Sequence, residues 1–315
     1  MKHLFIVNPS AGKGKPLRLI PVIKQFFAAN ASLLGNDFVI EITQYPGEAT
    51  EIVRRYVAGA KLRVYSVGGD GTLNEVVNGL IGSDSSLAII PTGSGNDFVR
   101  SLPYDLPIHD LLFCTANGEA EPVDLAVVNG RYFINIASVG FDAEVVYQAQ
   151  KMKNALMPSH LCYFAGIVRT LCRYNNLRLK VSLDGQVREA KFLLMAIANG
   201  KYYGGGILPT PDARIDDGLL DVCLITEKNF LQIVTTLPKY IKGRHREIPG
   251  VDFYKVREVK VYSEREFPLN IDGEIVMARE AAFRIIPQGI KLVIPRTAGF
   301  ISRLQAAATS PNYDG

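Results

Sequence analysis

The chain has 315 residues, of which 48% are hydrophobic and 21% are charged, and its formal net charge is +4. This composition excludes a largely disordered chain, and the length is sufficient for two domains with separate cores. A net charge of +4 is too small to indicate binding to nucleic acid, although it permits weak attraction to an anionic membrane surface.

The first 122 residues predict one domain of alternating strands and helices. Strands are expected at residues 4–7, 38–43, 62–67 and 87–90, with helices at 17–29, 48–58 and 72–81. This alternation is typical of a parallel sheet covered by helices on both faces, whose ligands bind at the carboxyl ends of the strands. Three of the four strands end in loops rich in glycine, serine or threonine, and the other ends near Thr43. The pattern therefore predicts a nucleotide-binding α/β domain.

The loop at residues 68–75, with the sequence GGDGTLNE, is the most informative of these. Its glycines allow a close approach of the backbone to a ligand, and the following helix start offers free N–H groups to phosphate. The carboxylate of Asp70 has little use beside bare phosphate, but it suits a metal ion or a hydroxyl acceptor. From this loop alone, an ordinary turn with an Asp helix cap remains an equal alternative.

Two standard phosphate motifs are absent from the chain. The GKGKP stretch at residues 12–16 does not supply a P-loop, and the first strand is not followed by a dinucleotide G-x-G-x-x-G. We therefore expect the phosphates to be held by three loops together, at residues 8–13, 68–72 and 93–96.

Residues 123–296 predict antiparallel β structure, folded as a sandwich or a distorted barrel. The pairs Asn129-Gly130 and Asp184-Gly185 each indicate a tight hairpin. Further strands are expected at residues 219–225, 256–262, 267–271, 283–286 and 290–294, with helical inserts at 142–153, 160–174 and 230–241. A C-terminal helix within residues 297–315 is expected to pack back on the first domain.

The cysteines and the lengths of the apolar runs indicate the cellular compartment of the protein. No C-x-x-C pair or zinc-spaced Cys/His cluster includes any of the cysteines, which are Cys114, Cys162, Cys172 and Cys223. Residues 1–3 lead directly into a strand, so no secretory signal is expected, and runs such as 192–198 are too short to span a bilayer. The sequence predicts a cytoplasmic protein with reduced thiols and only peripheral membrane contact.

Several motifs occur together, in order. They are N-P-x-x-G at residues 8–12, the loop at 68–75, P-x-G-x-x-N-D-F at 91–98, GGG at 204–206, P-x-A at 211–213, DDGLLD at 216–221 and DGE at 272–274. As a set they resemble the diacylglycerol kinase catalytic-domain family, in particular its soluble bacterial lipid kinases. The likeness runs from about residue 2 to residue 296. It implies an NAD-kinase/phosphofructokinase-like three-layer α/β domain followed by a β-sandwich domain for the lipid substrate.

The resemblance also implies cofactors, namely ATP and Mg²⁺. Asp70 would lie near the catalytic magnesium. Ser94 stands where the family often has threonine, which keeps a hydroxyl there. The residues implied to bind the nucleotide are Asn8, Ser10, Gly12, Lys13, Thr43, Gly68, Gly69, Gly71, Thr72, Asn74, Glu75, Gly93, Ser94, Asn96 and Asp97. From the residues alone, Lys13 is as well explained as a solvated loop lysine, and Asp97 as a helix cap.

Two further carboxylate groups are implied to act from the second domain. Glu274 matches the general base, with Asp272 as its partner or rival. Asp217 matches a structural magnesium ligand, assisted by Asp216 and by two backbone carbonyls, those of Arg214 and Leu219. The pattern alone favours a type I′ turn at 272–273 with an exposed glutamate after it, and an Asx turn at 216–218.

The sequence thus predicts a lipid kinase that transfers the ATP γ-phosphate to a lipid hydroxyl, with diacylglycerol as the expected acceptor and phosphatidic acid as the product of phospholipid metabolism. An NAD kinase is the alternative enzyme, although the motifs at 93–98 and 217–220 argue against it. A nucleotide-binding regulator without catalysis is the other alternative. The joint presence of Asp70, Asp217 and Glu274 argues against that reading.

Contact with the lipid is expected at the membrane surface. One basic cluster follows an apolar helix and comprises Lys239, Lys242, Arg244, His245 and Arg246. A second candidate places Met152, Leu156, Met157 and Leu161 near Lys151 and Lys153. Basic residues beside apolar ones suit an anionic bilayer, but the first cluster also suits the C-terminus of any helix. Edge strands of the β domain would permit a homodimer.

Overall fold

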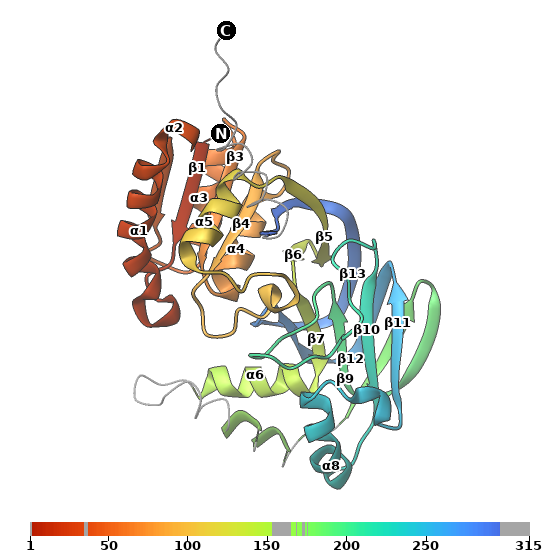
Figure 1. Ribbon diagram of the computed structural model, residues 1–315. Helices are drawn as coiled ribbons and strands as arrows, with labels where there is room; N and C mark the ends of the chain where they lie inside the picture. The colour runs from red at the N-terminus through yellow and green to blue at the C-terminus, as the bar shows by residue number, and fades with distance from the viewer. Residues whose placement is uncertain are drawn as a thin grey trace.

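The computed structural model describes residues 2–34, 37–152, 165–167, 169–171, 174 and 176–296 (Figure 1). The predicted C-terminal helix within 297–315 lies outside the described residues. So do Lys153, Leu156, Met157 and Leu161 of the second membrane cluster, together with Cys162 and Cys172.

The first module is a parallel sheet with helices on both faces. Its strands are β1 (Lys2–Val7), β2 (Phe38–Ile42), β3 (Leu62–Gly68) and β4 (Ser86–Pro91), in the order β4-β3-β1-β2. Its helices are α1 (Lys15–Ala29), the short α2 (Ala31–Leu34), α3 (Glu48–Val57), α4 (Asp70–Leu80) and α5 (Ile108–Asn117). Helix α1 packs on α5 and α3 packs on α4. Right-handed crossovers would place the two pairs on opposite faces of the sheet, as expected for the predicted three-layer arrangement.

The core of this module follows from its strand sequences. Strand β3 is buried along its whole length, as expected for the central region of a parallel sheet. The rings of Phe5 and Tyr65 stack at 4.0 Å between neighbouring strands, and Phe27 of α1 meets Phe5 edge-on. This rigid centre fixes the strand ends from which the glycine-rich loops emerge.

The second module is antiparallel β structure with helices outside it. Its strands are β5 (Ala120–Val128), β6 (Arg131–Phe133), β7 (Ile136–Gly140), β8 (Leu177–Leu183), β9 (Gln186–Ala198), β10 (Leu220–Thr226), β11 (Val251–Val256), β12 (Glu258–Ile271) and β13 (Glu274–Val293). Its helices include α6 (Phe141–Lys151) and α8 (Phe230–Ile241), and residues 165–167 and 169–171 are also helical. Both β9 and β12 pair with β7 and with β8, so the long strands join the two layers of the sandwich around one core.

The predicted hairpins are confirmed by left-handed turn residues. Asn129 and Gly130, Asp184 and Gly185, and the pair at 272–273 all have positive φ, as a type I′ turn requires. The structure corrects the predicted strands at 256–262 and 267–271: from Glu258 onward both are parts of the single strand β12, while residue 256 ends β11. The register of β12 shifts between Tyr262 and Phe267, and the polar residues at 264–266 lie in this exposed bulge. Because their composition is typical of a loop, the sequence predicted a break in the strand there.

The two modules share one continuous sheet. Strand β13 pairs with β12 and β5, and its final residues run parallel to β4, with Lys291 opposite Ser86. The predicted domain boundary at residue 122 falls inside β5, and Val123 and Leu125 belong to the first core. Among the described residues, no helix is both long and apolar enough to cross a membrane.

Candidate active site

Three glycine-rich loops meet at the carboxyl ends of β1, β3 and β4. The backbone N–H groups of Thr92 and Gly93 both donate to the carbonyl of Gly68, at 2.9 and 3.2 Å. A Cβ atom on Gly93 would lie only 2.4 Å from the Cα of Gly69, and one on Gly12 only 1.8 Å from the carbonyl oxygen of Thr92. The loops therefore touch backbone to backbone, which only glycine allows at these points.

A hollow of about 180 Å³ opens beside these loops. Its lining includes six of the predicted nucleotide-binding residues, Asn8, Ser10, Thr43, Gly71, Thr72 and Glu75, together with Gln44, Tyr45, Pro46 and Ala49. The amide of Asn8 donates to the hydroxyl of Thr72 at 2.9 Å, which ties the β1 loop to the start of α4. The N-terminus of α4 lies at this hollow and favours a negatively charged ligand.

Other predicted nucleotide-binding residues do not line this hollow. Lys13 is exposed and has φ of +59°, an unusual backbone conformation for a lysine. Ser94 is exposed, while the Asn96 side chain closes its own loop through two hydrogen bonds with Gly93, each of 2.9 Å. Asn74 is turned toward the second module. Their roles toward a nucleotide stay predictions.

Asp70 and Asp97 form a close pair of carboxylates at the centre of the loops. The backbone N–H of Asp97 donates to Asp70 Oδ1 at 2.8 Å, and the N–H of Gly205, from the second module, donates to Asp97 Oδ2 at 2.8 Å. Arg100 Nε lies 3.2 Å from the other oxygen of Asp97. Burial raises the pKa of Asp70, the charge of Asp97 raises it further, and backbone N–H groups oppose both effects.

The side chain of Asp272 is held by three donors. They are Asn74 Nδ2 at 2.9 Å, the N–H of Ile136 at 2.9 Å and the N–H of Ile134 at 3.1 Å. Burial raises the pKa of Asp272 to about 6, against the effect of these donors, and the charge of Asp70 adds to the rise. Asp272 is thus both a turn residue, as the hairpin pattern predicted, and a link between the modules.

Glu274 begins β13 two residues later and has a different environment. Its carboxylate is exposed and forms an ion pair with Arg131 of β6. Both side chains line a second hollow of about 410 Å³, together with Asn74 and Glu75 of α4. Glu75 and Pro46 line this hollow and also the nucleotide hollow, so the two adjoin. Glu274 thus lies in a space shared with α4, and its role as general base stays a prediction.

Asp70 fits the catalytic magnesium that the family resemblance implies. Mg²⁺ at phosphate sites is bound by one or two carboxylates, with the remaining positions taken by phosphate oxygens and water. Asp70 is a carboxylate at the first turn of α4, next to Gly71 of the nucleotide hollow, and its pKa is raised first by burial and then by the charge of Asp97, both of which a bound cation would offset. Asp97 provides a second carboxylate nearby.

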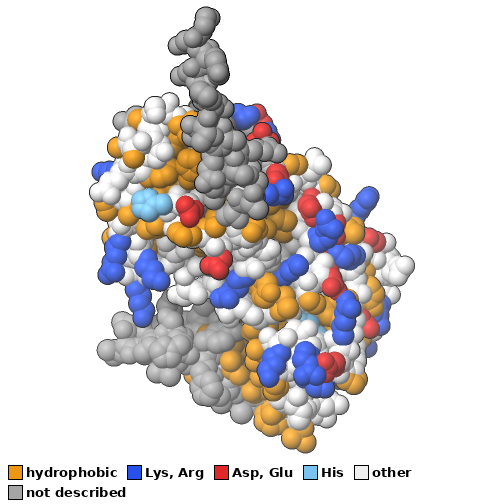
Figure 2. Space-filling view, in the orientation of Figure 1, with side chains coloured by type: hydrophobic (Ala, Val, Ile, Leu, Met, Phe, Trp, Pro, Cys, Tyr) orange, Lys and Arg blue, Asp and Glu red, His pale blue; other side chains and the backbone are white. Residues whose placement is uncertain are grey.

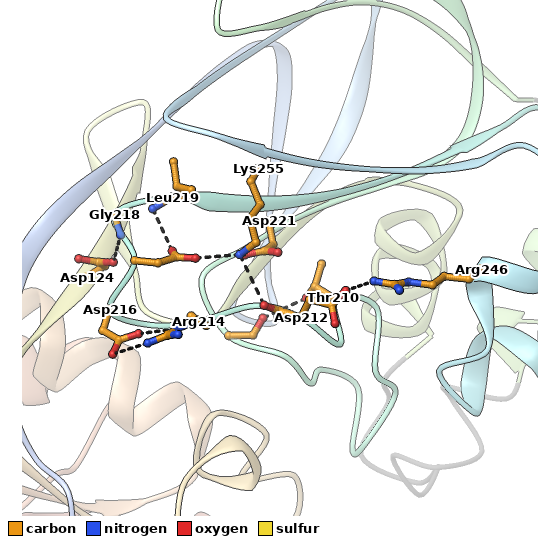
Figure 3. A network of polar contacts seen from close by, with 12 residues as sticks. Asp124, Thr210, Asp212, Arg214, Asp216, Gly218, Leu219, Asp221, Arg246 and Lys255 are labelled. Atoms are coloured by element: carbon orange, nitrogen blue, oxygen red, sulfur yellow. Dashed lines mark hydrogen bonds and ion pairs between the residues drawn. The ribbon is translucent and has the colours of Figure 1, made fainter.

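The second implied magnesium site does not fit its residues. Asp217 Oδ2 accepts a bond of 2.8 Å from Lys255 Nζ, and Asp217 Oδ1 accepts one of 3.2 Å from the N–H of Leu219 (Figure 3). Asp216 is paired with the guanidinium of Arg214. Within the described ranges, no group of three or more His, Cys, Asp or Glu side chains is arranged to hold a metal.

Sequence reasoning missed Asp124, which organises this region. Its carboxylate is almost fully buried and accepts bonds from the N–H groups of Gly218 at 2.6 Å and Gln288 at 2.9 Å. The available signal was an acidic residue in the middle of an apolar strand, since such a residue must find donors. Lys255 gave no comparable signal, because lysines are common on exposed strand faces.

Comparisons with known proteins agree with this architecture. Residues 2–128 match the family described as diacylglycerol kinase catalytic domain, and residues 135–294 match the YegS C-terminal NAD kinase beta sandwich-like domain. The chain is 30% identical over 295 residues to "Diacylglycerol kinase" of Staphylococcus carnosus (strain TM300), covering 93% of this chain and 94% of that protein. It is 29% identical over 299 residues to "Diacylglycerol kinase" of Bacillus subtilis (strain 168), covering 93% and 96%.

A solved structure gives the same result for the fold. A candidate diacylglycerol kinase from Bacillus anthracis str. Sterne superposes with a TM-score of 0.76 at 27% identity, over 93% of this chain and 95% of that one. The matches extend through both modules, in the same order as the loops and hairpins described above. The resemblance stated from the motifs is thereby confirmed, and the chain belongs to the diacylglycerol kinase catalytic-domain family.

Proposed function

We propose that this protein is a lipid kinase that transfers the γ-phosphate of ATP, with Mg²⁺, to a lipid hydroxyl. The observation that carries the proposal is the sharing of Glu75 and Pro46 between two hollows. One hollow is lined by the residues suited to a nucleotide, and the other by Glu274. A donor phosphate and an acceptor alcohol bound in these adjoining spaces would meet near α4.

Each requirement of phosphoryl transfer can be assigned to groups of this chain. Free N–H groups of the glycine-rich loops and of the α4 N-terminus hold and orient the phosphates. Magnesium bound at Asp70 would neutralise charge on the phosphates during transfer. Glu274 accepts the proton of the acceptor hydroxyl, after its ion pair with Arg131 opens. Asp272 acts as a positioning residue, because its three donors fix the turn that presents Glu274.

An apolar cavity near the site favours a lipid as the acceptor. It encloses about 170 Å³ between α6, α8 and β9, and most of its lining is aliphatic or aromatic. Tyr203 lines this cavity, and Gly205, two residues further, donates to Asp97. One short loop therefore connects the cavity wall with the carboxylate pair. The cavity is suited to part of an acyl chain, with the polar end of the lipid directed toward the phosphates.

The relatives named diacylglycerol kinase favour diacylglycerol as the acceptor and phosphatidic acid as the product, a step of phospholipid synthesis. An apolar cavity is not needed by an NAD kinase, whose acceptor is a water-soluble dinucleotide. A regulator that binds nucleotide without turnover would not need Glu274 beside the nucleotide hollow. Both alternatives remain as outcomes of the test below.

The exposed side chains of helix α8 favour binding of the protein to a cytoplasmic membrane surface. Its outer face exposes large apolar side chains, with Leu231 72% and Phe230 53% exposed, while Ile233 and Tyr240 on its inner face line the cavity. Figure 2 shows hydrophobic side chains gathered at the end of the molecule where α8 lies, with Lys and Arg side chains close by. Apolar residues bordered by cations suit peripheral contact with an anionic bilayer. A homodimer stays a prediction.

The test is a turnover assay with γ-labelled ATP, Mg²⁺ and a panel of lipids and NAD. Label that partitions into organic solvent with diacylglycerol supports the proposal, and Glu274→Gln should abolish nearly all of it. Label that stays in the aqueous phase only with NAD would identify an NAD kinase. Nucleotide binding without any labelled product would identify a regulator.

A further inference from the structure

Lys255 lies against Asp217, the carboxylate that the family resemblance assigns to a structural magnesium ion. Its Nζ lies 2.8 Å from Asp217 Oδ2, 3.1 Å from Asp221 Oδ2 and 3.5 Å from the carbonyl oxygen of Asp212 (Figure 3). Three acceptors match the three N–H donors of an ammonium group. We propose that the Lys255 ammonium is the built-in cation of this site, so that the loop at 214–221 is held without a metal ion.

The strand register brings Lys255 to this position. In the β10–β11 pair Lys255 is directly opposite Asp221, and side chains of directly opposed residues lie on the same face of a sheet. Asp221 is 7% exposed, so its carboxylate needs a partner close at hand. Burial raises the pKa of Asp221, and Lys255 opposes that rise. The strand register therefore places the ammonium beside Asp221, although the Lys255 side chain is 39% exposed.

The same contacts compete with magnesium at Asp217. A magnesium ion requires carboxylate oxygens at about 2.0–2.1 Å in an octahedral arrangement. Both oxygens of Asp217 already accept hydrogen bonds, from Lys255 and from the N–H of Leu219. Burial lowers the pKa of Lys255, but the bonds to the two carboxylates outweigh it and raise the pKa above its usual value, so the cation persists at neutral pH.

The loop at 214–221 supports the strands that connect the two modules. Gly218, next to Asp217, donates to Asp124 of β5, and Asp124 also accepts from Gln288 of β13. Strands β5 and β13 both extend from the second module to the first. With Lys255 as the fixed cation, magnesium is needed only at the phosphate-binding loops. Removal of magnesium by a chelator should therefore leave the connection through β5 and β13 intact.

Thermal unfolding of the full chain tests the proposal. The wild type should melt at the same temperature in EDTA and in millimolar Mg²⁺. Lys255→Met should melt lower in EDTA, by about 2–4 °C, because two carboxylates lose their cation. Added Mg²⁺ should recover part of that loss, and Asp217→Asn in the same background should remove the recovery. Lys191→Met is the control, since it breaks an exposed pair of 3.9 Å with Glu227.

Three results would overturn the proposal. The first is a fall in the wild-type melting temperature on adding EDTA. The second is about one equivalent of divalent metal retained by the purified wild type and lost in Asp217→Asn, and the third is a Lys255→Met variant as stable as Lys191→Met. If Lys255→Met does not fold, the metal content and EDTA response of the wild type and Asp217→Asn still decide the question.

Discussion

Asn74 of α4 donates a hydrogen bond of 2.9 Å to Asp272, in the turn between β12 and β13. This contact joins the helix behind the phosphate-binding loops to the hairpin that carries Glu274. The two residues are 198 positions apart in the chain, so this contact is one of those that hold the donor and acceptor halves of the site together. The following predictions use this arrangement and the surfaces around it.

Glu274→Gln should lower kcat by about two to four orders of magnitude, because the amide cannot accept the proton of the acceptor hydroxyl. Glu280→Gln is a matched control on the same strand, with an exposed side chain. Steady-state kinetics with a lipid acceptor provide the measurement. A change confined to KM would assign Glu274 to lipid positioning instead.

Asp70→Asn should abolish turnover and leave the fold intact. The amide oxygen can still accept the Asp97 N–H, but it is a much weaker ligand for magnesium than the carboxylate. Asp37→Asn serves as the control, since it removes an exposed carboxylate paired with Lys2. Activity and circular dichroism are to be compared; near-normal turnover of Asp70→Asn would refute a role in metal binding.

Asp142→Asn should stabilise the protein at neutral pH. Burial raises the pKa of Asp142 to about 6 from an ordinary value near 3.8, with Ser138 and Tyr203 opposing the rise. The folded state therefore binds more protons than the unfolded state between pH 4 and pH 6, and wild-type stability falls as the pH rises through this window. The melting temperature of the variant should exceed the wild type's at pH 7.5, and this gain should shrink toward pH 4.5. An equal gain at both pH values would contradict it.

Leu231→Glu should weaken binding to anionic vesicles, because it places a charge on the outer face of α8. Val187→Glu is the control: Val187 is 57% exposed and lies on the β8–β9 hairpin, away from α8. Co-sedimentation with vesicles provides the measurement. Equal binding to neutral and anionic vesicles would remove the electrostatic part of the proposal.

Gly93→Ala should raise KM for ATP and lower the melting temperature, because the new Cβ would lie 2.4 Å from the Cα of Gly69 and force two phosphate loops apart. Gly59→Ala is the control, since no atom lies within 4 Å of its added Cβ. If the two variants behave alike, the close approach of the loops does not matter for nucleotide binding.

Much of the fold could be predicted because its patterns are local. The apolar strands before Gly68 and Pro91 and the turn pairs at Asn129 and Asp184 determine their own conformations. The convergence of the glycine loops followed from the rule that carboxyl ends of parallel strands lie along one edge of the sheet. These predictions needed no knowledge of distant contacts.

The rest depended on pairing between remote segments. The first half of β13 is largely exposed, with Val276 and Met277 on its surface, and it is held as a strand by its pairing with β12. Similarly, the role of Lys255 could not be predicted, because it depends on the strand register that places Lys255 opposite Asp221. The ion pair that holds Glu274 depends on Arg131, which lies 143 positions away. A pattern in a single sequence carries no trace of such partners.

The course of β13 has a consequence for folding. Its last residues complete the sheet beside β4, so a polypeptide ending at residue 128 would leave one flank of β4 without hydrogen-bonding partners. Such a fragment would be prone to self-association, and the separated halves should not be expected to fold independently. Heating the intact protein should accordingly give a single cooperative transition, with both modules lost together.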